Sequence, residues 1–351
     1  MKPRFALRLI PAIWRMYRKQ PVFLSFNITN RCNQRCHMCN VWRAEAEELS
    51  LEEIARIFDE MKDYGIRIVE LTGGETLLRK DLYDICRLLD DRGLLYTMTT
   101  NGSLIDDGHL SALRGVRGLL QIAISVDSLD PWLYAKLRGR DNLASVLANI
   151  DRLIDANLNI PIKINFTLSR HNYRETLGML EYARSRGIFM SAFPVNQGPL
   201  SQHRSFDPFF FSTAAEREEM ARVFHELSDL RRRGEPLWEY SRFYRLAADF
   251  VRGRPVGRCD AGRLYLDLHA DGKLAPCLDR EPFADLRKEH LPDAMMKFAD
   301  RRRSVASCSE TTPCCYTCTY NVSITARHIF GFSLESLFGR LRHFMRRPVN
   351  P

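Results

Sequence analysis

The sequence lacks the features that would place the chain in a membrane or outside the cell. No apolar run approaches the roughly 20 residues of a membrane span. Arginines at positions 4, 8, 15 and 18 break up the segment where a secretion signal would need an apolar core. The chain also has no internal repeat and no low-complexity tract. With 351 residues, 45% hydrophobic and 27% charged, it is predicted to be globular and cytoplasmic.

Acidic residues are missing from the first 20 positions, which carry six Lys and Arg residues. Apolar residues recur there at helical intervals, and they do so again in the basic C-terminal tail that contains Arg346 and Arg347. We expect two terminal amphipathic helices that pack on the body with a solvated basic face, the first one interrupted at Pro11. The alternative is that these basic amphipathic termini contact an anionic membrane surface, which would make the protein membrane-associated.

The ten cysteines point to metal or redox chemistry, because disulfides are rare in a reducing cytoplasm. Cys32, Cys36 and Cys39 form a C-x3-C-x2-C loop in which each thiolate can hold one iron of a cubane [4Fe-4S] cluster. The fourth iron then lacks a protein ligand and is open to catalysis. The alternative is a zinc site in which His37 supplies the fourth ligand.

Strand and helix patterns alternate through the first half of the chain. Strands are expected at 22–28, 66–71, 94–99, 119–126, 162–168 and 189–195. Helices are expected near 50–62, 80–92, 106–113, 131–138, 142–156 and 173–186. Six such units predict an α/β fold, a partial (β/α)6 TIM-like barrel whose functional loops follow the strands.

The remaining chain divides into segments of different character. Around the barrel at 22–196 we expect an N-terminal amphipathic helix at 1–21, a helical linker or cap at 197–257, a cysteine-rich domain at 258–322 and a basic helical tail at 323–351. A charged helix from about Ala214 to Arg233 is expected within the linker.

Glycine-rich or polar motifs follow three successive barrel strands. Taken alone, each is typical of a turn. Their recurrence at one end of the expected sheet favours a binding site. They are Gly73-Gly74-Glu75, Thr100-Asn101, and Ser125 with Asp127.

The C-terminal region has a second cysteine set. A strand at 264–268 and a turn at 271–273 predict a hairpin that brings Cys259 near Cys277. Cys315 and Cys318 complete four thiolates, enough for an auxiliary [4Fe-4S] cluster. A four-cysteine zinc site or a Cys315-x2-Cys318 redox pair are the alternatives. Cys308 and Cys314 are left over, and Cys86 is expected in the core.

Together these motifs resemble the radical S-adenosylmethionine (radical SAM) superfamily with a C-terminal twitch or SPASM-like auxiliary-cluster domain. The resemblance implies that Cys32, Cys36 and Cys39 bind the catalytic cluster, while Cys259, Cys277, Cys315 and Cys318 bind the auxiliary one. It further implies that SAM contacts Met38, Gly73, Gly74, Glu75, Thr100, Asn101, Ser125, Asp127, Arg138, Asn165 and Val195. Thr76 stands where proline is common in the family.

The same resemblance implies that SAM is cleaved to a 5′-deoxyadenosyl radical that removes a substrate hydrogen. An auxiliary cluster near the substrate favours net oxidation of a small molecule such as a sugar, an aminocyclitol or a lipid precursor. An electron donor such as flavodoxin or ferredoxin is the expected partner, and no nucleic acid is expected. A peptide maturase is the alternative within the family. A non-enzymatic zinc or nucleic-acid-binding protein is the alternative of another class.

Overall fold

The computed structural model describes residues 3–195, 213–257, 259–299 and 318–328. Its centre is a sheet of nine strands in the order β6-β5-β4-β3-β2-β1-β7-β8-β9. The first six strands are parallel. They are β1 (Phe23–Thr29), β2 (Ile68–Gly73), β3 (Leu95–Thr100), β4 (Leu119–Ser125), β5 (Ile162–Leu168) and β6 (Phe189–Pro194).

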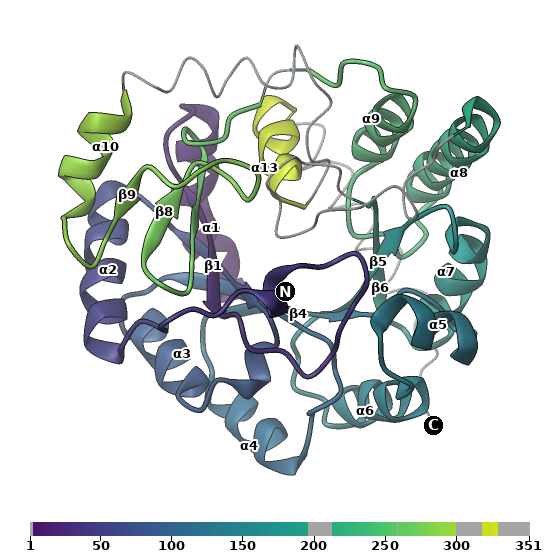
Figure 1. Cartoon of the computed structure of the whole chain (residues 1–351), viewed down its shortest axis with the longest axis horizontal. Helices are drawn as coiled ribbons and strands as arrows, with labels where there is room; N and C mark the ends of the chain where they lie inside the picture. The colour runs from purple at the N-terminus through teal and green to yellow at the C-terminus, as the bar shows by residue number, and fades with distance from the viewer. Residues whose placement is uncertain (1–2, 196–212, 258, 300–317, 329–351) are drawn as a thin grey trace.

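Helices follow the strands and cover the outer face of the curved sheet (Figure 1). They are α2 (Leu51–Tyr64), α3 (Leu82–Asp91), α4 (Asp107–Gly115), α5 (Pro131–Arg138), α6 (Leu143–Asp155) and α7 (Thr176–Ser185). This confirms the predicted partial (β/α)6 barrel. Ser50 is the N-cap of α2 and forms a capping box with Glu53.

Side chains alternate in β1 because successive residues of a strand point to opposite faces. Leu24, Phe26 and Ile28 are fully buried. The ring of Phe26 packs edge-on against Phe58 of α2, with centroids 5.9 Å apart. The alternate polar residues Ser25 and Asn27 instead line a cavity inside the barrel. The core therefore lies between sheet and helices, and the barrel interior stays polar.

The predicted C-terminal hairpin is present, and its strands extend the barrel sheet. β7 (Tyr265–Leu268) pairs in parallel with β1, and β8 (Lys273–Ala275) returns antiparallel to it. β9 (Ala284–Asp285) and α10 (Leu291–Ala299) follow. The cysteine-rich region is thus joined to the barrel through backbone hydrogen bonds beside the strand that carries the cluster loop.

Besides α10, four helices of the described residues lie outside the strand–helix repeat. The expected charged helix is α8 (Ala214–Arg232), which packs against α9 (Ser241–Val251). α13 (Cys318–Arg327) lies beside α1 (Pro3–Tyr17). Among the helices of the described ranges, none is long and apolar enough to cross a bilayer. The expected helical tail at 323–351 begins within α13, and its residues 329–351 lie outside the described residues.

The predicted interruption at Pro11 is wrong, since α1 continues through it. A proline removes one hydrogen bond and crowds the carbonyl four residues earlier, but the other bonds of a 15-residue helix are still available. The same helix also packs against the body through Ala12, whose side chain is 1% exposed. Tertiary packing thus overrides the local helix-breaking tendency.

Candidate active site

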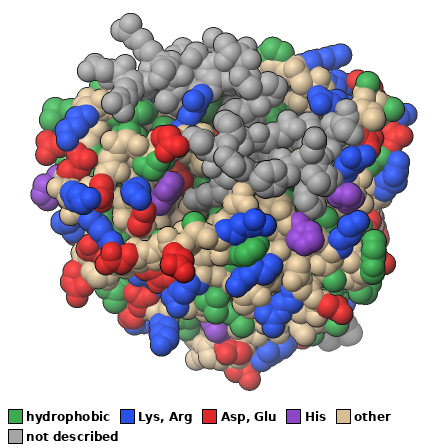
Figure 2. All heavy atoms as spheres, in the orientation of Figure 1, with side chains coloured by type: hydrophobic (Ala, Val, Ile, Leu, Met, Phe, Trp, Pro, Cys, Tyr) green, Lys and Arg blue, Asp and Glu red, His purple; other side chains and the backbone are tan. Residues whose placement is uncertain are grey.

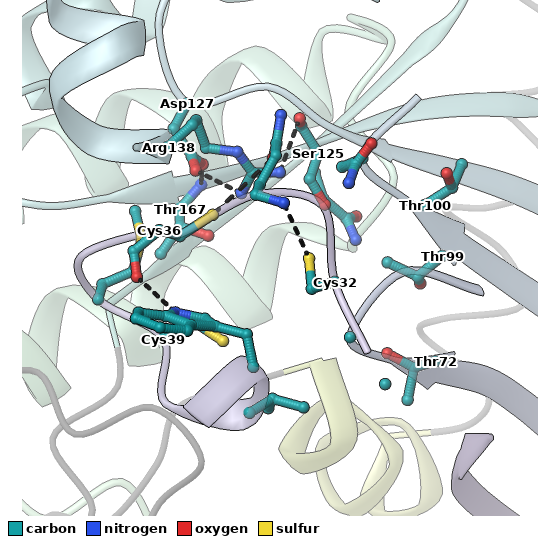
Figure 3. Close-up of a pocket in the computed structure, with 18 of the residues that line it drawn as sticks. Cys32, Cys36, Cys39, Thr72, Thr99, Thr100, Ser125, Asp127, Arg138 and Thr167 are labelled. Atoms are coloured by element: carbon teal, nitrogen blue, oxygen red, sulfur yellow. Dashed lines mark hydrogen bonds and ion pairs between the residues drawn. The ribbon is translucent and has the colours of Figure 1, made fainter. Parts of the chain in front are cut away.

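A cavity of about 200 Å³ opens at the carboxyl ends of the barrel strands. Thirteen of the fourteen residues predicted to bind the catalytic cluster or SAM line it, and Figure 3 shows several of them converging on it. They are Cys32, Cys36, Met38, Cys39, Gly73, Gly74, Thr100, Asn101, Ser125, Asp127, Arg138, Asn165 and Val195. The structure therefore gathers motifs up to 163 positions apart in the sequence, from Cys32 to Val195, around one space.

The loop that carries the three cysteines is fixed at its base by Arg79, whose side chain is 3% exposed. Arg79 donates through Nη1 to the carbonyl of Ile28 (2.6 Å) and through Nη2 to that of Leu49 (2.6 Å). Ile28 precedes the loop and Leu49 follows it. One planar guanidinium, itself oriented by Asp81 (2.8 Å), therefore holds both ends of the loop together.

The end of β2 holds the first residues of the loop by close backbone approach. The amide of Gly74 donates to the carbonyl of Thr29 (2.7 Å), and that of Glu75 donates to the carbonyl of Arg31 (2.8 Å). A Cβ atom at Gly74 would lie 2.2 Å from the Arg31 carbonyl oxygen, and one at Gly73 would lie 2.3 Å from the Thr29 oxygen. Both positions therefore require glycine for packing, whatever else they bind.

The tip of the loop is held by neighbouring strand ends and by α5. Asn101 donates to the side-chain oxygen of Asn33 (2.7 Å), and the amide of His37 donates to the carbonyl of Leu137 (3.1 Å). Gln34 donates to the hydroxyl of Tyr134 (3.0 Å). These contacts fix a segment that has no regular secondary structure before Val41.

The Cys36 thiol is buried, and those of Cys32 and Cys39 are half-buried. Burial raises the pKa of Cys36 to about 12 and that of Cys39 to about 11, and it also raises the pKa of Cys32. Without a bound cation these thiols stay protonated. A bound metal centre would displace the protons, because cysteine binds metals as the deprotonated thiolate. All three are free of disulfides.

This donor set fits a cubane cluster. Three thiolates from one loop can each hold a different iron, and the cavity beside them leaves space at the fourth. A single zinc ion needs all its ligands to converge on one point. Among the residues that the structure describes, no three His, Cys, Asp or Glu side chains are arranged in that way.

A buried ion pair lies beside the loop in the cavity wall. Arg138, at the end of α5, donates to Asp127 Oδ2 (3.0 Å) and to the carbonyl of Ser125 (3.1 Å). Burial lowers the pKa of Arg138, but Cys36 and Asp127 together raise it above its usual value, so the guanidinium stays charged. Its Nε–H is buried without a hydrogen-bond partner and can donate to an anionic ligand.

Glu75 lies behind the cavity wall instead of lining it. Its carboxylate accepts from Thr100 Oγ1 (2.5 Å), from the amide of Asn101 (2.6 Å) and from the amide of Leu77 (3.1 Å). Burial raises its pKa, against the lowering effect of these donors. In this arrangement Glu75 orders the ends of β2 and β3. Its predicted contact with SAM stays a prediction.

The second cysteine set is described only in part. Cys259 is buried and its sulfur lies 3.1 Å from the hydroxyl of Tyr265, while Cys277 is half-buried. α13 begins at Cys318 and packs on the Cys259 segment, because Ser323 Oγ accepts from the amide of Asp260 (3.0 Å). Cys308, Cys314 and Cys315 lie outside the described residues. Cys86 is fully buried in the core, as predicted.

Sequence reasoning missed the residues that line the barrel interior. The clearest signal for them is a polar residue at every second position of an otherwise apolar strand. In β1 these are Ser25 and Asn27, and in β2 they are Glu70 and Thr72. The other cavity-lining residues that the motifs did not identify are Gln34, Val41, Trp42, Thr99, Thr167, Phe193, Pro194 and Leu278.

Comparisons with known proteins agree with this geometry. Residues 26–183 match the family model described as the Radical SAM superfamily. The chain is 30% identical over 272 residues to a probable GTP 3′,8-cyclase of Sulfurisphaera tokodaii, covering 74% of this chain and 81% of that protein. It is 28% identical over 284 residues to a probable GTP 3′,8-cyclase of Methanothermobacter marburgensis, covering 79% of this chain and 88% of that protein.

Two solved structures share the fold. anSMEcpe with bound AdoMet and the Cp18Cys peptide superimposes with a TM-score of 0.63 at 14% identity, covering 82% of this chain and 83% of that one. Streptococcus suis SuiB bound to S-adenosylmethionine superimposes with a TM-score of 0.62 at 16% identity, covering 78% of this chain and 65% of SuiB. The present chain therefore spans slightly less than two thirds of SuiB. At these identities the likeness extends to the fold alone.

Proposed function

We propose that this chain, which belongs to the radical SAM superfamily and is a [4Fe-4S] enzyme that uses SAM, takes a hydrogen atom from a polar small molecule. The observation that carries the proposal is the convergence of Cys32, Cys36 and Cys39 with the strand-end motifs on one cavity. When bound, the cluster and SAM supply a 5′-deoxyadenosyl radical to the substrate. The protein contributes binding, orientation and exclusion of water.

Within that site we assign SAM's amino-acid part to the strand-end groups. The Nε–H of Arg138 is an unused buried donor for a carboxylate, while Asp127 keeps the guanidinium in place. Asn165 carries a buried side-chain oxygen without a partner, which suits a ribose hydroxyl. Met38 and Val195 are buried apolar wall residues suited to the adenine.

An auxiliary [4Fe-4S] cluster held by Cys259, Cys277, Cys315 and Cys318 is the second part of the proposal. It is supported by the hairpin that joins the Cys259 and Cys277 segments and by α13, which starts at Cys318 and packs on the former. Four thiolates close such a cluster. A cluster that accepts an electron from the substrate radical favours net oxidation of the substrate over isomerisation.

GTP is the first substrate to test, because proteins named as probable GTP 3′,8-cyclases are 28–30% identical over about three quarters of the chain. The cavity suits a polar substrate, since the side-chain nitrogen of Asn27 is buried there without a partner. Sugars, aminocyclitols and polar lipid precursors form the next set. Peptide substrates are the second candidate class, because anSMEcpe and SuiB share the fold and have been solved with peptides.

The test is anaerobic incubation of the iron-loaded protein with SAM, dithionite and each candidate substrate. We expect 5′-deoxyadenosine to form faster with the true substrate and not at all in a Cys32→Ala variant. Roughly eight irons per chain are expected, and roughly four after Cys259→Ala and Cys277→Ala. Cys86→Ala is the control that keeps the iron. Stoichiometric zinc without iron, or SAM cleavage by Cys32→Ala, would overturn the proposal.

We further propose that an acidic one-electron carrier protein, such as a flavodoxin or ferredoxin, docks on a basic collar formed by Arg35, Arg43 and Arg140. All three are exposed and contact the cluster loop. The guanidinium groups of Arg35 and Arg43 lie 4.8 and 4.7 Å from the ring centroid of Trp42, and Arg140 donates to the carbonyl of Asn33 (2.8 Å). Figure 2 shows basic side chains gathered on this face.

Charge reversal separates docking from catalysis. Arg43→Glu with Arg140→Glu should slow turnover driven by the acidic carrier about tenfold at low salt, because steering of opposite charges raises association rates. Turnover driven by dithionite should not change. An equal loss with both reductants would contradict the docking assignment.

A further inference from the structure

One side of α1 exposes large apolar side chains that the proposed function does not use. Seven large apolar side chains are exposed among the described residues, and four of them belong to this helix. These four are Ile10 (56% exposed), Ile13 (45%), Trp14 (56%) and Tyr17 (58%). Their i, i+3, i+4, i+7 spacing places them on a single stripe, which we call the outer face of α1.

The opposite side of α1 fixes the helix to the body. Ala12 is buried and Met16 is partly buried against the core. Arg15 donates through Nε to the carbonyl of Pro21 (2.9 Å) and through Nη2 to that of Tyr64 (3.0 Å). A Cβ atom at Gly65 would lie 1.8 Å from Arg15 Nη2, so glycine makes room for this anchor. The outer face is thus presented in one orientation.

The outer face has the composition of a helix that lies at a lipid–water interface. The rings of Trp14 and Tyr17 stack with centroids 5.9 Å apart, and Arg18 lies 5.8 Å from the Trp14 ring. Large aromatic rings with a polar end favour the headgroup region, and aliphatic neighbours insert just below it. The first 20 residues contain no acid, and of their six Lys and Arg residues Arg15 is the anchor on the opposite side while Arg18 lies beside the outer face.

We propose that the outer face of α1 docks the enzyme on an anionic lipid bilayer, with Ile10, Ile13, Trp14 and Tyr17 inserted at the headgroup level. Charge complementarity selects this occupant. A twofold contact between copies would bring two acid-free basic segments together and be opposed by their repulsion. Lipid phosphates instead attract each basic residue near the surface.

Docking in this orientation leaves the active site accessible. α1 leads into the amino end of β1, while the cavity opens at the carboxyl end of the same strand. The seven residues of β1 span roughly 23 Å. The bilayer would therefore hold the enzyme at the membrane without covering the mouth through which SAM and a polar substrate enter.

The experiment is flotation of the full-length protein with vesicles of phosphatidylcholine alone or with one quarter phosphatidylglycerol. We expect binding to the anionic vesicles only, and loss of it in 0.5 M salt. Trp14→Ser with Tyr17→Ser should weaken binding at least about tenfold, because two large apolar contacts with the interface are removed. Trp132→Ser is the matched control, since Trp132 is an exposed tryptophan (71%) on α5.

Folding and assembly are followed in the same variants. Circular dichroism and dithionite-driven SAM cleavage should be unchanged, because Trp14 and Tyr17 are exposed and do not line the cavity. Equal binding to both vesicle types, no binding, or binding unaffected by the double substitution would overturn the proposal. So would a wild-type dimer that the double substitution converts to a monomer, because the face would then be a contact between copies.

Discussion

Arg138 Nη1 donates a 3.0 Å hydrogen bond to Asp127 Oδ2, and the side chains are 10% and 1% exposed. The pair joins the end of α5 to the end of β4, and the second Asp127 oxygen accepts from the amide of Thr167 on β5 (2.9 Å). A single carboxylate therefore sets the position of the guanidinium and the spacing of two strand ends beside the cysteine loop.

Asp127→Asn should destabilise the fold and weaken SAM binding together. The amide keeps the shape but leaves the Arg138 charge buried without a counterion, which typically costs about 3–5 kcal/mol. Denaturant unfolding and SAM titration measure the two effects. Asp107→Asn breaks an exposed pair with Arg152 (2.7 Å) and should cost less than about 1 kcal/mol. Equal effects of the two substitutions would contradict a special role for Asp127.

Arg79→Lys should loosen the cysteine loop. One ammonium cannot reproduce the planar set of bonds to Ile28, Leu49 and Asp81, so about 3 kcal/mol of stability should be lost. Iron retention under a chelator should fall with it. Arg117→Lys is the control, because Arg117 is 61% exposed. Iron retention as in the wild type would show that the loop does not depend on this anchor.

Gly74→Ala should lower iron content and SAM binding more than global stability. The added Cβ would meet the Arg31 carbonyl oxygen at 2.2 Å, and this is backbone of the cysteine loop itself, so the loop has to move. Gly178→Ala is a matched control in α7, where nothing lies within 4 Å, and it should stabilise by about 0.5–1 kcal/mol. Iron analysis and thermal unfolding of both variants check the expectation.

Stability should fall as the pH rises through the titration of His269. Burial lowers the pKa of His269, but the carboxylate of Asp267, 3.2 Å from Nε2, outweighs this and raises it above 6.5. Because the pKa of His269 is higher in the folded protein than in the unfolded chain, its protonation stabilises the fold. This stabilisation is fully present below pH 6.5 and is lost as the pH rises above the folded-state pKa. Asp271 also raises this pKa and Lys273 lowers it.

Unfolding of the metal-free protein between pH 5.5 and 9 measures this effect. Asp267→Asn should remove most of the fall in the free energy of unfolding that His269 causes as the pH rises. Asp271→Asn should remove less of this fall. An unchanged pH profile in Asp267→Asn would contradict the assignment.

The predicted barrel strands agree with the structure because each is an apolar run that ends at a glycine or polar turn. The cysteine loop could also be predicted, since C-x3-C-x2-C spacing is a local property of Cys32, Cys36 and Cys39. The predicted break at Pro11 failed because packing of Ala12 against the body is not visible in the local sequence. The position of Glu75 behind the wall depends on Thr100 and Asn101, which belong to a different strand.

By itself, the sequence determined the strand–helix repeat, the cysteine spacing and the strand-end motifs, because these follow from periodicity and from the chemistry of neighbouring residues. Only the tertiary structure decided that β7 joins the barrel beside β1, that Arg79 ties Ile28 to Leu49, and that one side of α1 stays exposed. Each of these features depends on which residues, distant in the chain, come into contact or cover one another. Such contacts produce no periodic pattern in the sequence.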